Sequence, residues 1–154
     1  MSGSIIPPMK QDTFESEIFI RSTVEKTLSL AHEYERHHNF HPLIVKVEVD
    51  AHPPAGVLKR YFITDQLQWG PFRFKIKYRA DILSVTANDF HTEAYQSPGT
   101  TVVNHTTVTP MEGGVKLHER ITLRAPDLLF SYAFGQARTA HQGMLESIKA
   151  YLES

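Results

Sequence analysis

One strand-like segment carries an ionisable residue where an apolar one is expected. In Val115–Arg124 every second residue from 115 to 123 is aliphatic except Glu119. Side chains alternate between the faces of a strand, so Glu119 is expected to face the same interior as its aliphatic neighbours. A buried carboxylate costs several kcal/mol unless it is paired, hydrogen-bonded or protonated, and a protonated one can act as a general acid. Alternatively, Glu119 lies near a strand end, reaches solvent, or follows a bulge that shifts the register.

A histidine lies on the apolar face of a long helical segment. His141 precedes Leu145 by four residues, and an imidazole between helix and sheet could bond a ligand oxygen or transfer a proton near neutral pH. Equally, a lone core histidine is often a packed residue bonded to a neighbour. Asn104 and Thr106 alternate with valines and could share the inner face. With Glu119 they would form a polar patch in an apolar pocket, the usual arrangement for orienting an apolar ligand.

Three neighbouring histidines raise the question of a metal site. His37 and His41 are four residues apart and, with His38, could lie on one short helix. Pro42 is expected to end that helix, and no carboxylate stands at a recognisable ligand spacing. We therefore expect no metal site. The chain has no cysteine, and it lacks a nucleophile elbow, a phosphate-binding glycine loop and a nicotinamide fingerprint, so no cofactor is expected.

The elements that must position these residues are mostly strands. In Phe72–Leu83, apolar residues at even positions alternate with charged ones at odd positions from 72 to 82. This period of two predicts a long antiparallel strand. Its inner face would consist of Phe72, Phe74, Ile76, Tyr78, Ala80 and Ile82. Six more strands are predicted from similar runs and the turn signals between them: Thr13–Arg21, Leu43–Val49, Leu58–Gln66, Phe90–Gln96, Thr101–Thr109 and Val115–Arg124.

Helices are predicted after the first strand and at the end of the chain. Ser22 and Glu25 form a capping-box signature for a first helix, and a second short helix is expected within 32–40. Asp127 is the expected N-cap of the last helix. Gly135 and Gly143 lie inside that helix; either they let it pass close to strands or leave room for a ligand, or Gly135 marks a kink. The apolar face of this helix contains Phe134, Ala137, His141, Leu145, Ile148 and Leu152.

The order of elements predicts the fold class. Residues 1–11 are expected to form a flexible tail, because Gly3 and Pro7-Pro8 disfavour regular structure. Residues 12–154 are expected to form a single domain containing a strand, two short helices, six strands and a long helix. Antiparallel strands with segregated helices make this an α+β domain.

The bulk composition restricts the class of partner. The net charge is -1 and 41% of residues are apolar, which is typical of a globular protein and argues against a nucleic-acid binder. No segment has the length of a membrane span or a signal peptide, so the cytoplasm is the expected compartment. No oligomeric state is indicated.

A basic stripe is expected on the outer face of the sheet. Its members are Arg73, Lys75, Lys77 and Arg79 of one strand and Lys116, His118, Arg120 and Arg124 of another. Such a face could make peripheral contact with an anionic membrane or bind an acidic partner. Alternatively, it is a solvated face with Glu15, Glu17 and Glu93 as cross-strand partners.

The element order resembles the helix-grip fold of the START and Bet v 1-like (SRPBCC) superfamily, within it the polyketide cyclase/dehydrase and lipid-transport group. The resemblance covers residues 13–153. It rests on segments 22–28 and 41–44, on Gly70-Pro-Phe72, and on segment 140–149 of the last helix. It implies a curved seven-stranded antiparallel sheet wrapped around the last helix, with an apolar cavity between them. Members bind lipids, sterols, polyketides or plant hormones, and a minority catalyse cyclisation or dehydration.

The resulting prediction is a protein that binds and carries a small hydrophobic ligand, such as a lipid, sterol or polyketide-like molecule. The expected ligand contacts are Trp69, Phe74, Ile76, Tyr78, Asn104, Thr106, Leu117, Ile121, His141 and Leu145. Trp69, Pro71 and Phe72 would form a gate, since such loops rim the cavity in helix-grip proteins. The alternative is an aromatase/cyclase or dehydratase in which Glu119 and His141 move protons. A third possibility is a protein-interaction module that uses the basic outer sheet.

Overall fold

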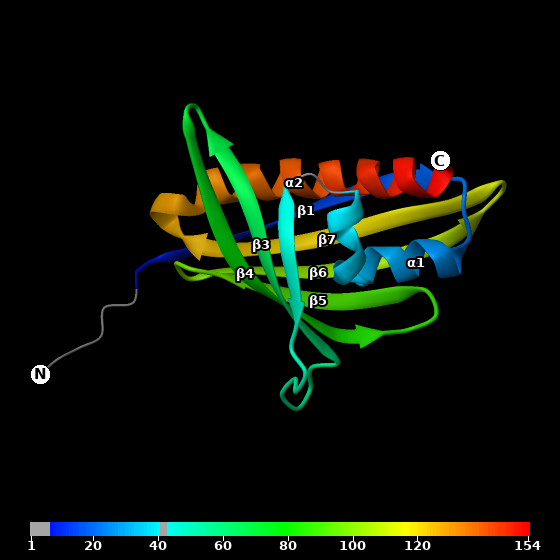
Figure 1. Cartoon of the computed structure of the whole chain (residues 1–154), viewed down its shortest axis with the longest axis horizontal. Coiled ribbons are helices and arrows are strands. Elements are labelled where there is room, and N and C mark those ends of the chain that lie inside the picture. Colours follow the sequence, from blue (N-terminus) through cyan, green and yellow to red (C-terminus); the bar gives the residue numbers. More distant parts are fainter. Residues whose placement is uncertain (1–6, 41–42) are drawn as a thin grey trace, which may run out of the picture.

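The computed structural model describes residues 7–40 and 43–154, without the side chains of residues 68 and 69. Within these described ranges, seven strands, two α-helices and one 3-10 helix follow one another (Figure 1). Their bounds are β1 Met9–Ile20, α1 Val24–His32, η1 Tyr34–Asn39, β2 Ile44–Val49, β3 Lys59–Trp69, β4 Phe72–Val85, β5 Asp89–Gln96, β6 Thr100–Met111, β7 Gly114–Pro126 and α2 Asp127–Glu153.

The strands form one antiparallel sheet in the order β1-β7-β6-β5-β4-β3-β2. Strands β2 to β7 are joined by successive hairpins, whereas α1 and η1 carry the chain from β1 at one edge to β2 at the other. The sheet is curved, and strands β3 and β4 run steeply across the direction of β6 and β7 (Figure 1). Helix α2 lies along β1 and β7. The predicted α+β helix-grip fold is therefore confirmed.

Several predicted boundaries were wrong. Strand β1 begins at Met9, so residues 9–11 belong to the sheet and not to the tail. The N-cap of α1 is Thr23 instead of Ser22, and its hydroxyl accepts a hydrogen bond from the Lys26 N–H. Strand β7 extends to Pro126, which is the N-cap of α2 in place of Asp127. A proline fits before a helix because it has no N–H to satisfy.

The largest core cluster lies where α1 and the second half of α2 cover the sheet. Leu145 and Ile148 of α2 pack there with Leu30 of α1 and Leu117 of β7, and each exposes at most 2% of its surface. Burying a side chain of this size stabilises a fold by about 1.5–3 kcal/mol. A second cluster fills the β2–β4 side of the sheet, around Tyr61.

The inner face of β4 is only partly buried. Ala80 and Ile82 are buried as the alternation predicts, but Phe72 is 68% exposed and Phe74 is 40% exposed. These two phenylalanines lie at the end of the β3–β4 hairpin, whose tip projects beyond α2 (Figure 1). The prediction that they line a buried face was therefore wrong. The alternation correctly gave the strand, but it does not show how far the neighbouring elements extend.

The two glycines of α2 do not make close contacts with the sheet. A Cβ atom added to Gly135 or Gly143 would meet nothing within 4 Å outside the helix's own backbone. The close approach happens elsewhere: a Cβ on Gly114, at the start of β7, would lie 2.3 Å from the carbonyl oxygen of Ile20.

Candidate functional site

Four polar residues expected to share the inner face form one hydrogen-bonded cluster. Strands β6 and β7 place Thr106 directly opposite Glu119. The Asn104 amide Nδ2 donates to Glu119 Oε2 at 3.0 Å, and the Thr106 hydroxyl donates to Asn104 Oδ1 at 2.9 Å. His141 reaches down from α2 and brings its Nδ1 to 3.2 Å from the same Glu119 oxygen. We call these four residues the inner polar cluster.

Glu119 occupies the middle of β7 and is only 6% exposed. It pairs with Ser16 on one side and Thr106 on the other, in an unbroken register. Neither a strand end nor a bulge therefore moves it away from the interior. Leu117 and Ile121, its neighbours on the same face, are fully buried.

The environment of His141 makes it an unusual histidine. Burial on its own lowers the pKa of this imidazole, but the charge and hydrogen bond of Glu119 outweigh it, and the pKa lies above its ordinary value. The Phe14 ring packs edge-on against the imidazole at 6.1 Å between centroids. About a quarter of the His141 side chain stays exposed. The pair can therefore exchange a proton with a group that reaches this face.

A second carboxylate faces the interior, and the sequence analysis missed it. Asp65 of β3 pairs with Ile44 on one side and Ile76 on the other. Burial raises its pKa to about 6. The signal was present, because Tyr61, Ile63, Asp65 and Leu67 repeat the interrupted apolar row seen around Glu119.

Each of the two inner carboxylates keeps one buried oxygen without a partner. Among the described residues, Asp65 Oδ1 and Glu119 Oε1 have no hydrogen-bond donor. Leaving a buried acceptor unpaired costs about 1–3 kcal/mol, and more for a charged one. A fold that keeps two such oxygens on one face has acceptors for which the described part of the chain supplies no donor.

Two tyrosines complete the inner face near Asp65. Burial raises the pKa of Tyr34, on η1, to about 12, and Thr92 of β5 is its hydrogen-bond partner. Burial also raises the pKa of Tyr78, on β4, and the charge of Asp65 and the Tyr34 group add to this effect. Both phenols are therefore neutral donors at physiological pH. Tyr34 had not been predicted, because a residue in a short helix has no strand alternation to indicate its direction.

The other predicted contacts are distributed unevenly. Leu117, Ile121 and Leu145 are buried, and Ile76 is half-buried, as is Tyr78. Phe74 lies on the exposed part of the hairpin, as does Phe72 of the proposed gate; Pro71, at the turn, is exposed as well. The side chain of Trp69 lies outside the described residues.

Partly exposed side chains on the inner face indicate where it is accessible. Ile76, Tyr78, Phe134, Ala137 and His141 all keep some solvent contact. They belong to β4 and to residues 134–141 of α2, and the buried residues of α2 lie after this stretch, at Leu145 and Ile148, apart from Phe130. Solvent therefore reaches the inner face between the β3–β4 hairpin and the beginning of α2.

The histidines near residue 37 do not assemble a metal site among the described residues. His37 is buried, and its Nε2 hydrogen-bonds the Leu30 carbonyl at 2.8 Å. Its ring packs against Tyr34 and Phe40. His38 is exposed, and His41 lies outside the described residues. The role of His37 is to join η1 to α1.

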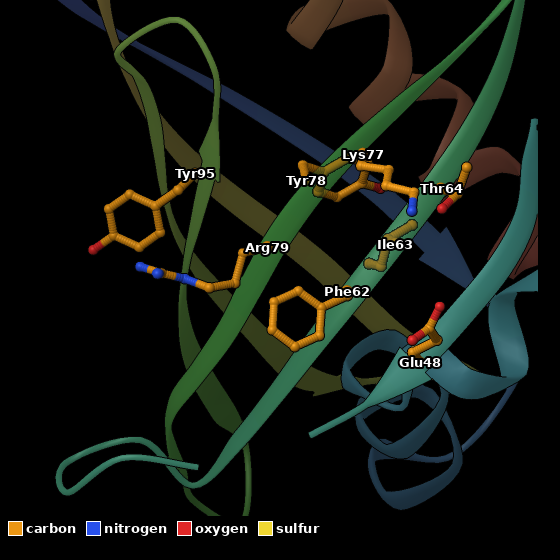
Figure 2. Close-up of a pocket in the computed structure, with 8 residues that line it drawn as sticks. All are labelled: Glu48, Phe62, Ile63, Thr64, Lys77, Tyr78, Arg79 and Tyr95. Atoms are coloured by element: carbon orange, nitrogen blue, oxygen red, sulfur yellow. The ribbon is translucent and has the colours of Figure 1, made fainter. Parts of the chain in front are cut away.

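The outer face of the sheet mixes both signs of charge. Glu15 approaches His118 at 3.3 Å and Glu17 approaches Lys116 at 3.8 Å, as the cross-strand alternative predicted. A hollow of about 460 Å³ lies on this face over β2–β5. Figure 2 shows it between Glu48, Phe62 and Tyr95, with Lys77 and Arg79 projecting from β4.

The inner hollow expected from the resemblance would be a different space from the outer one in Figure 2. The second hollow of similar size is lined by α1, η1 and Leu152 of α2 and also lies away from the inner polar cluster. No helix among the described residues is long and apolar enough to cross a membrane.

Comparisons with known proteins identify the fold. No protein-family model matches the sequence, and no curated protein sequence matches it either. Among solved structures, the chain is similar to Ara h 8.0201, with a TM-score of 0.70 at 16% identity over 93% of this chain and 98% of that one. It is also similar to a Thalictrum norcoclaurine synthase, with a TM-score of 0.70 at 11% identity over 94% and 96% of the two chains.

A third similar structure is BexL, a di-domain ARO/CYC protein of the BE-7585A biosynthetic pathway. The TM-score is 0.78 at 9% identity, over 94% of this chain and 50% of BexL. The chain thus spans about half of that protein. These likenesses show that the chain shares the helix-grip fold of these proteins. A shared fold at such low identity does not transfer a function.

Proposed function

We propose that the protein binds a small, mainly apolar molecule that carries hydroxyl, phenol or amine donors, between the sheet and α2. The observation that carries this proposal is the pair of buried carboxylate oxygens without donors, Asp65 Oδ1 and Glu119 Oε1. Apolar side chains around them would bury the body of the ligand at about 25 cal/mol per Å². The ligand's donors would pair with the two oxygens and fix its orientation.

The nature of the fold neighbours supports the same class of ligand. BexL is a di-domain ARO/CYC protein of a biosynthetic pathway, and the norcoclaurine synthase structure holds a transition-state analogue. We infer a lipid, sterol or polyketide-like ligand for this chain and the cytoplasm as its compartment.

A fluorescent pair of probes tests the proposal. We would titrate the protein with 1-naphthol, which has a phenolic donor, and with 1-methoxynaphthalene, which has nearly the same shape and no donor. A hydrogen bond to a charged acceptor contributes about 1.5–3 kcal/mol, so 1-naphthol should bind at least about tenfold more tightly. Glu119→Gln and Asp65→Asn should each reduce that preference.

Glu15→Gln serves as the matched control, because Glu15 lies on the outer face and pairs with His118. It should leave the preference unchanged. Equal affinity for the two probes in the unmodified protein would refute the role of the carboxylates. Absence of binding by either probe would refute the inner ligand site itself.

The Glu119–His141 pair supports a second candidate, an aromatase/cyclase or dehydratase. In such a reaction a base removes one proton from a CH2 group between two carbonyl groups, that carbon bonds to another carbonyl carbon, and the alkoxide formed takes up the proton. Removal of the second proton from the same carbon, with transfer of a proton to the new hydroxyl, then forms a C=C bond and releases water. Glu119 would accept each proton from carbon and His141 would return it to the oxygen. If the protein converts a poly-β-keto thioester, Glu119→Gln and His141→Ala should abolish conversion while 1-naphthol binding persists. Unchanged turnover in both variants would exclude this role.

A further inference from the structure

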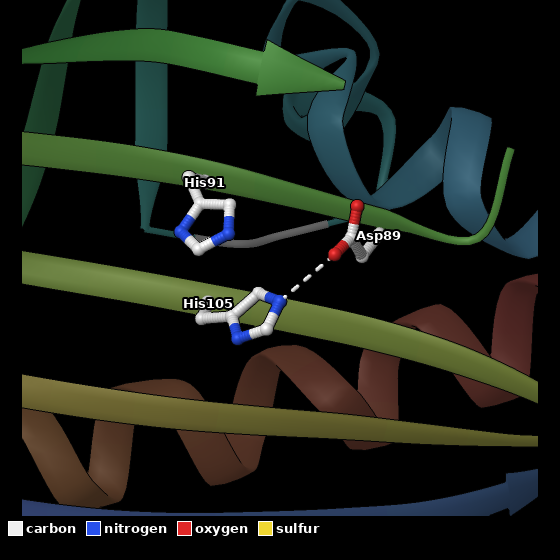
Figure 3. A group of neighbouring side chains, drawn as sticks. All are labelled: Asp89, His91 and His105. Carbon is white, nitrogen blue, oxygen red and sulfur yellow. Dashed lines mark hydrogen bonds and ion pairs between the residues drawn. The ribbon is translucent and has the colours of Figure 1, made fainter. Parts of the chain in front are cut away.

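A second group of ionisable side chains lies on the opposite, outer face of the sheet. His91 of β5 and His105 of β6 stand directly across from each other in the strand register. Asp89 precedes His91 by two residues on β5, so its side chain points to the same side of the sheet. Figure 3 shows the three side chains converging above β5 and β6. We call them the outer triad.

The ligand atoms of the outer triad are close together. One nitrogen from each imidazole and one carboxylate oxygen all lie within 4.8 Å of one another. His105 Nε2 is 3.0 Å from Asp89 Oδ2. The two imidazole rings are stacked, with centroids 4.0 Å apart and planes inclined by 9°. All three side chains are half-buried, so they are held by neighbours and remain accessible to an ion.

The Thr86 hydroxyl fixes the orientation of the Asp89 carboxylate. The Thr86 hydroxyl donates to Asp89 Oδ1 at 2.5 Å, and the backbone N–H of Asp89 donates to the same hydroxyl at 3.1 Å. This leaves Oδ2 turned toward His105. A carboxylate oriented by a second hydrogen bond is typical of metal-ligating residues, whose partners fix the direction of the ligand oxygen.

We propose that the outer triad binds a divalent transition-metal ion of the Zn²⁺ type, with water in the remaining position. Two imidazoles and one carboxylate form a donor set that Zn²⁺ prefers, with ligand distances of about 2.0–2.2 Å. Atoms bound to one ion at that distance lie within about 4 Å of each other, so the separations between the three ligand atoms need to shorten only slightly. Because a metal lies in the plane of each ligating ring, the imidazoles must rotate out of their stack, which their half-exposed positions allow.

One neighbouring positive charge would repel the ion, and its exposed position weakens this repulsion. Arg120 of β7 is the cross-strand neighbour of His105, on the same outer face. Its side chain is exposed, and Glu15 stands opposite it on β1. Water screens a charge in such a position. A bound ion would cross-link β5 to β6 independently of what the inner polar cluster binds.

Zinc titration of the untagged protein by calorimetry tests the proposal, since a histidine tag would itself bind the metal. We expect one Zn²⁺ per chain. His91→Gln and His105→Gln should each weaken binding at least about tenfold, and the double variant should lose it. Zn²⁺ should also shift the NMR signals of these two imidazole rings before those of any other histidine.

His52→Gln is the matched control, because His52 is an exposed residue in the β2–β3 connection. It should bind Zn²⁺ like the unmodified protein. Melting temperatures without metal should agree among all variants, which shows that they fold. The proposal is overturned if the unmodified protein shows no saturable Zn²⁺ binding, or if the double variant binds as tightly as the control.

Discussion

Asp65 and Glu119 present the same problem at the scale of single residues, a carboxylate inside an apolar face. For Glu119 the cost of burial is offset in part by Asn104 and His141, which both hydrogen-bond its Oε2. For Asp65 the described residues offer no such partner for Oδ1, and its pKa rises to about 6. The two carboxylates should therefore respond differently to substitution and to pH.

Asp65→Asn should stabilise the protein at neutral pH. In the folded state the proton is held up to a pH of about 6, whereas the ordinary value is 3.8. The folded state therefore binds more protons in this window, and stability falls as the pH rises through it. After allowance for partial exposure, we expect Asp65→Asn to add about 1–2 kcal/mol above pH 6.

Thermal melts between pH 3.5 and 8 would measure this gain, with Asp12→Asn, an exposed residue on β1, as the control. The fall in melting temperature across the window should be smaller in Asp65→Asn than in the control. A loss of stability at pH 7 would mean that Asp65 has a favourable partner in solution.

Glu119→Gln should reverse the pKa shift of His141. Burial lowers this pKa, and only the charge and hydrogen bond of Glu119 raise it above 6.5. Without the charge, burial dominates, and the pKa should fall below 6.5. The pKa of His141 can be measured in both proteins by following its imidazole Hε1 signal by NMR as the pH is varied.

The stability of the protein should follow the same titration. Because the folded pKa of His141 is raised, its contribution is present below about pH 6.5 and is lost as the pH rises through the folded pKa. Glu119→Gln should reverse that dependence, because with a pKa below 6.5 the folded state binds fewer protons than the unfolded state and stability rises with pH. An unchanged pKa in the variant would show that Glu119 does not hold the proton on His141.

At the scale of elements, α2 contains two glycines whose removal should be favourable. Alanine is favoured over glycine in a helix by about 0.5–1 kcal/mol. The added methyl group would meet nothing within 4 Å at Gly135 or Gly143 outside the backbone of α2. Both substitutions should stabilise the protein by about that amount in urea unfolding, and their effects should add.

Gly114→Ala provides the contrasting variant. Its Cβ would lie 2.3 Å from a backbone oxygen, so this change should be destabilising by more than the others stabilise. Destabilisation by Gly135→Ala or Gly143→Ala would mean that the helix needs the freedom of glycine at that point.

Strand patterns predicted the elements well and their extent poorly. The alternation in β4 gave the strand and the buried positions of Ala80 and Ile82. It could not reveal that Phe72 and Phe74 are exposed, because the tip of the β3–β4 hairpin projects past α2 and that depends on where a distant helix begins. For the same reason the sequence did not predict that Met9 belongs to β1. Whether a residue at the end of a strand joins the sheet depends on its partner strand, which here is the end of β7.

The inner polar cluster could be predicted because each residue breaks a regular apolar pattern in its own segment. Asp65 broke such a pattern too and could have been found in the same way. The outer triad could not be found, since Asp89 and His91 are unremarkable without the register that brings His105 across from them. Cross-strand register is a property of the sheet and not of any one strand.

Over the whole molecule, polar groups are divided between two surfaces of one sheet. The inner face carries carboxylates and phenols among apolar residues, and the outer face carries ion pairs and the outer triad. Because successive residues of a strand point to opposite faces, Thr106 faces inward and the preceding residue, His105, faces outward. A metal outside would therefore act on β5 and β6 and a ligand at the inner polar cluster on β6 and β7, so that the two share β6 from opposite sides.

The pairing of β1 with β7 has a consequence for how the chain reaches this state. Phe14 of β1 pairs with Ile121 of β7, so the first strand of the chain cannot join the sheet until the last strand is available. During synthesis β1 leaves the ribosome long before β7, and closing so long a loop is slow. Until then the apolar side of β1 has no cover, and exposed apolar surface of this kind makes a nascent chain prone to aggregation.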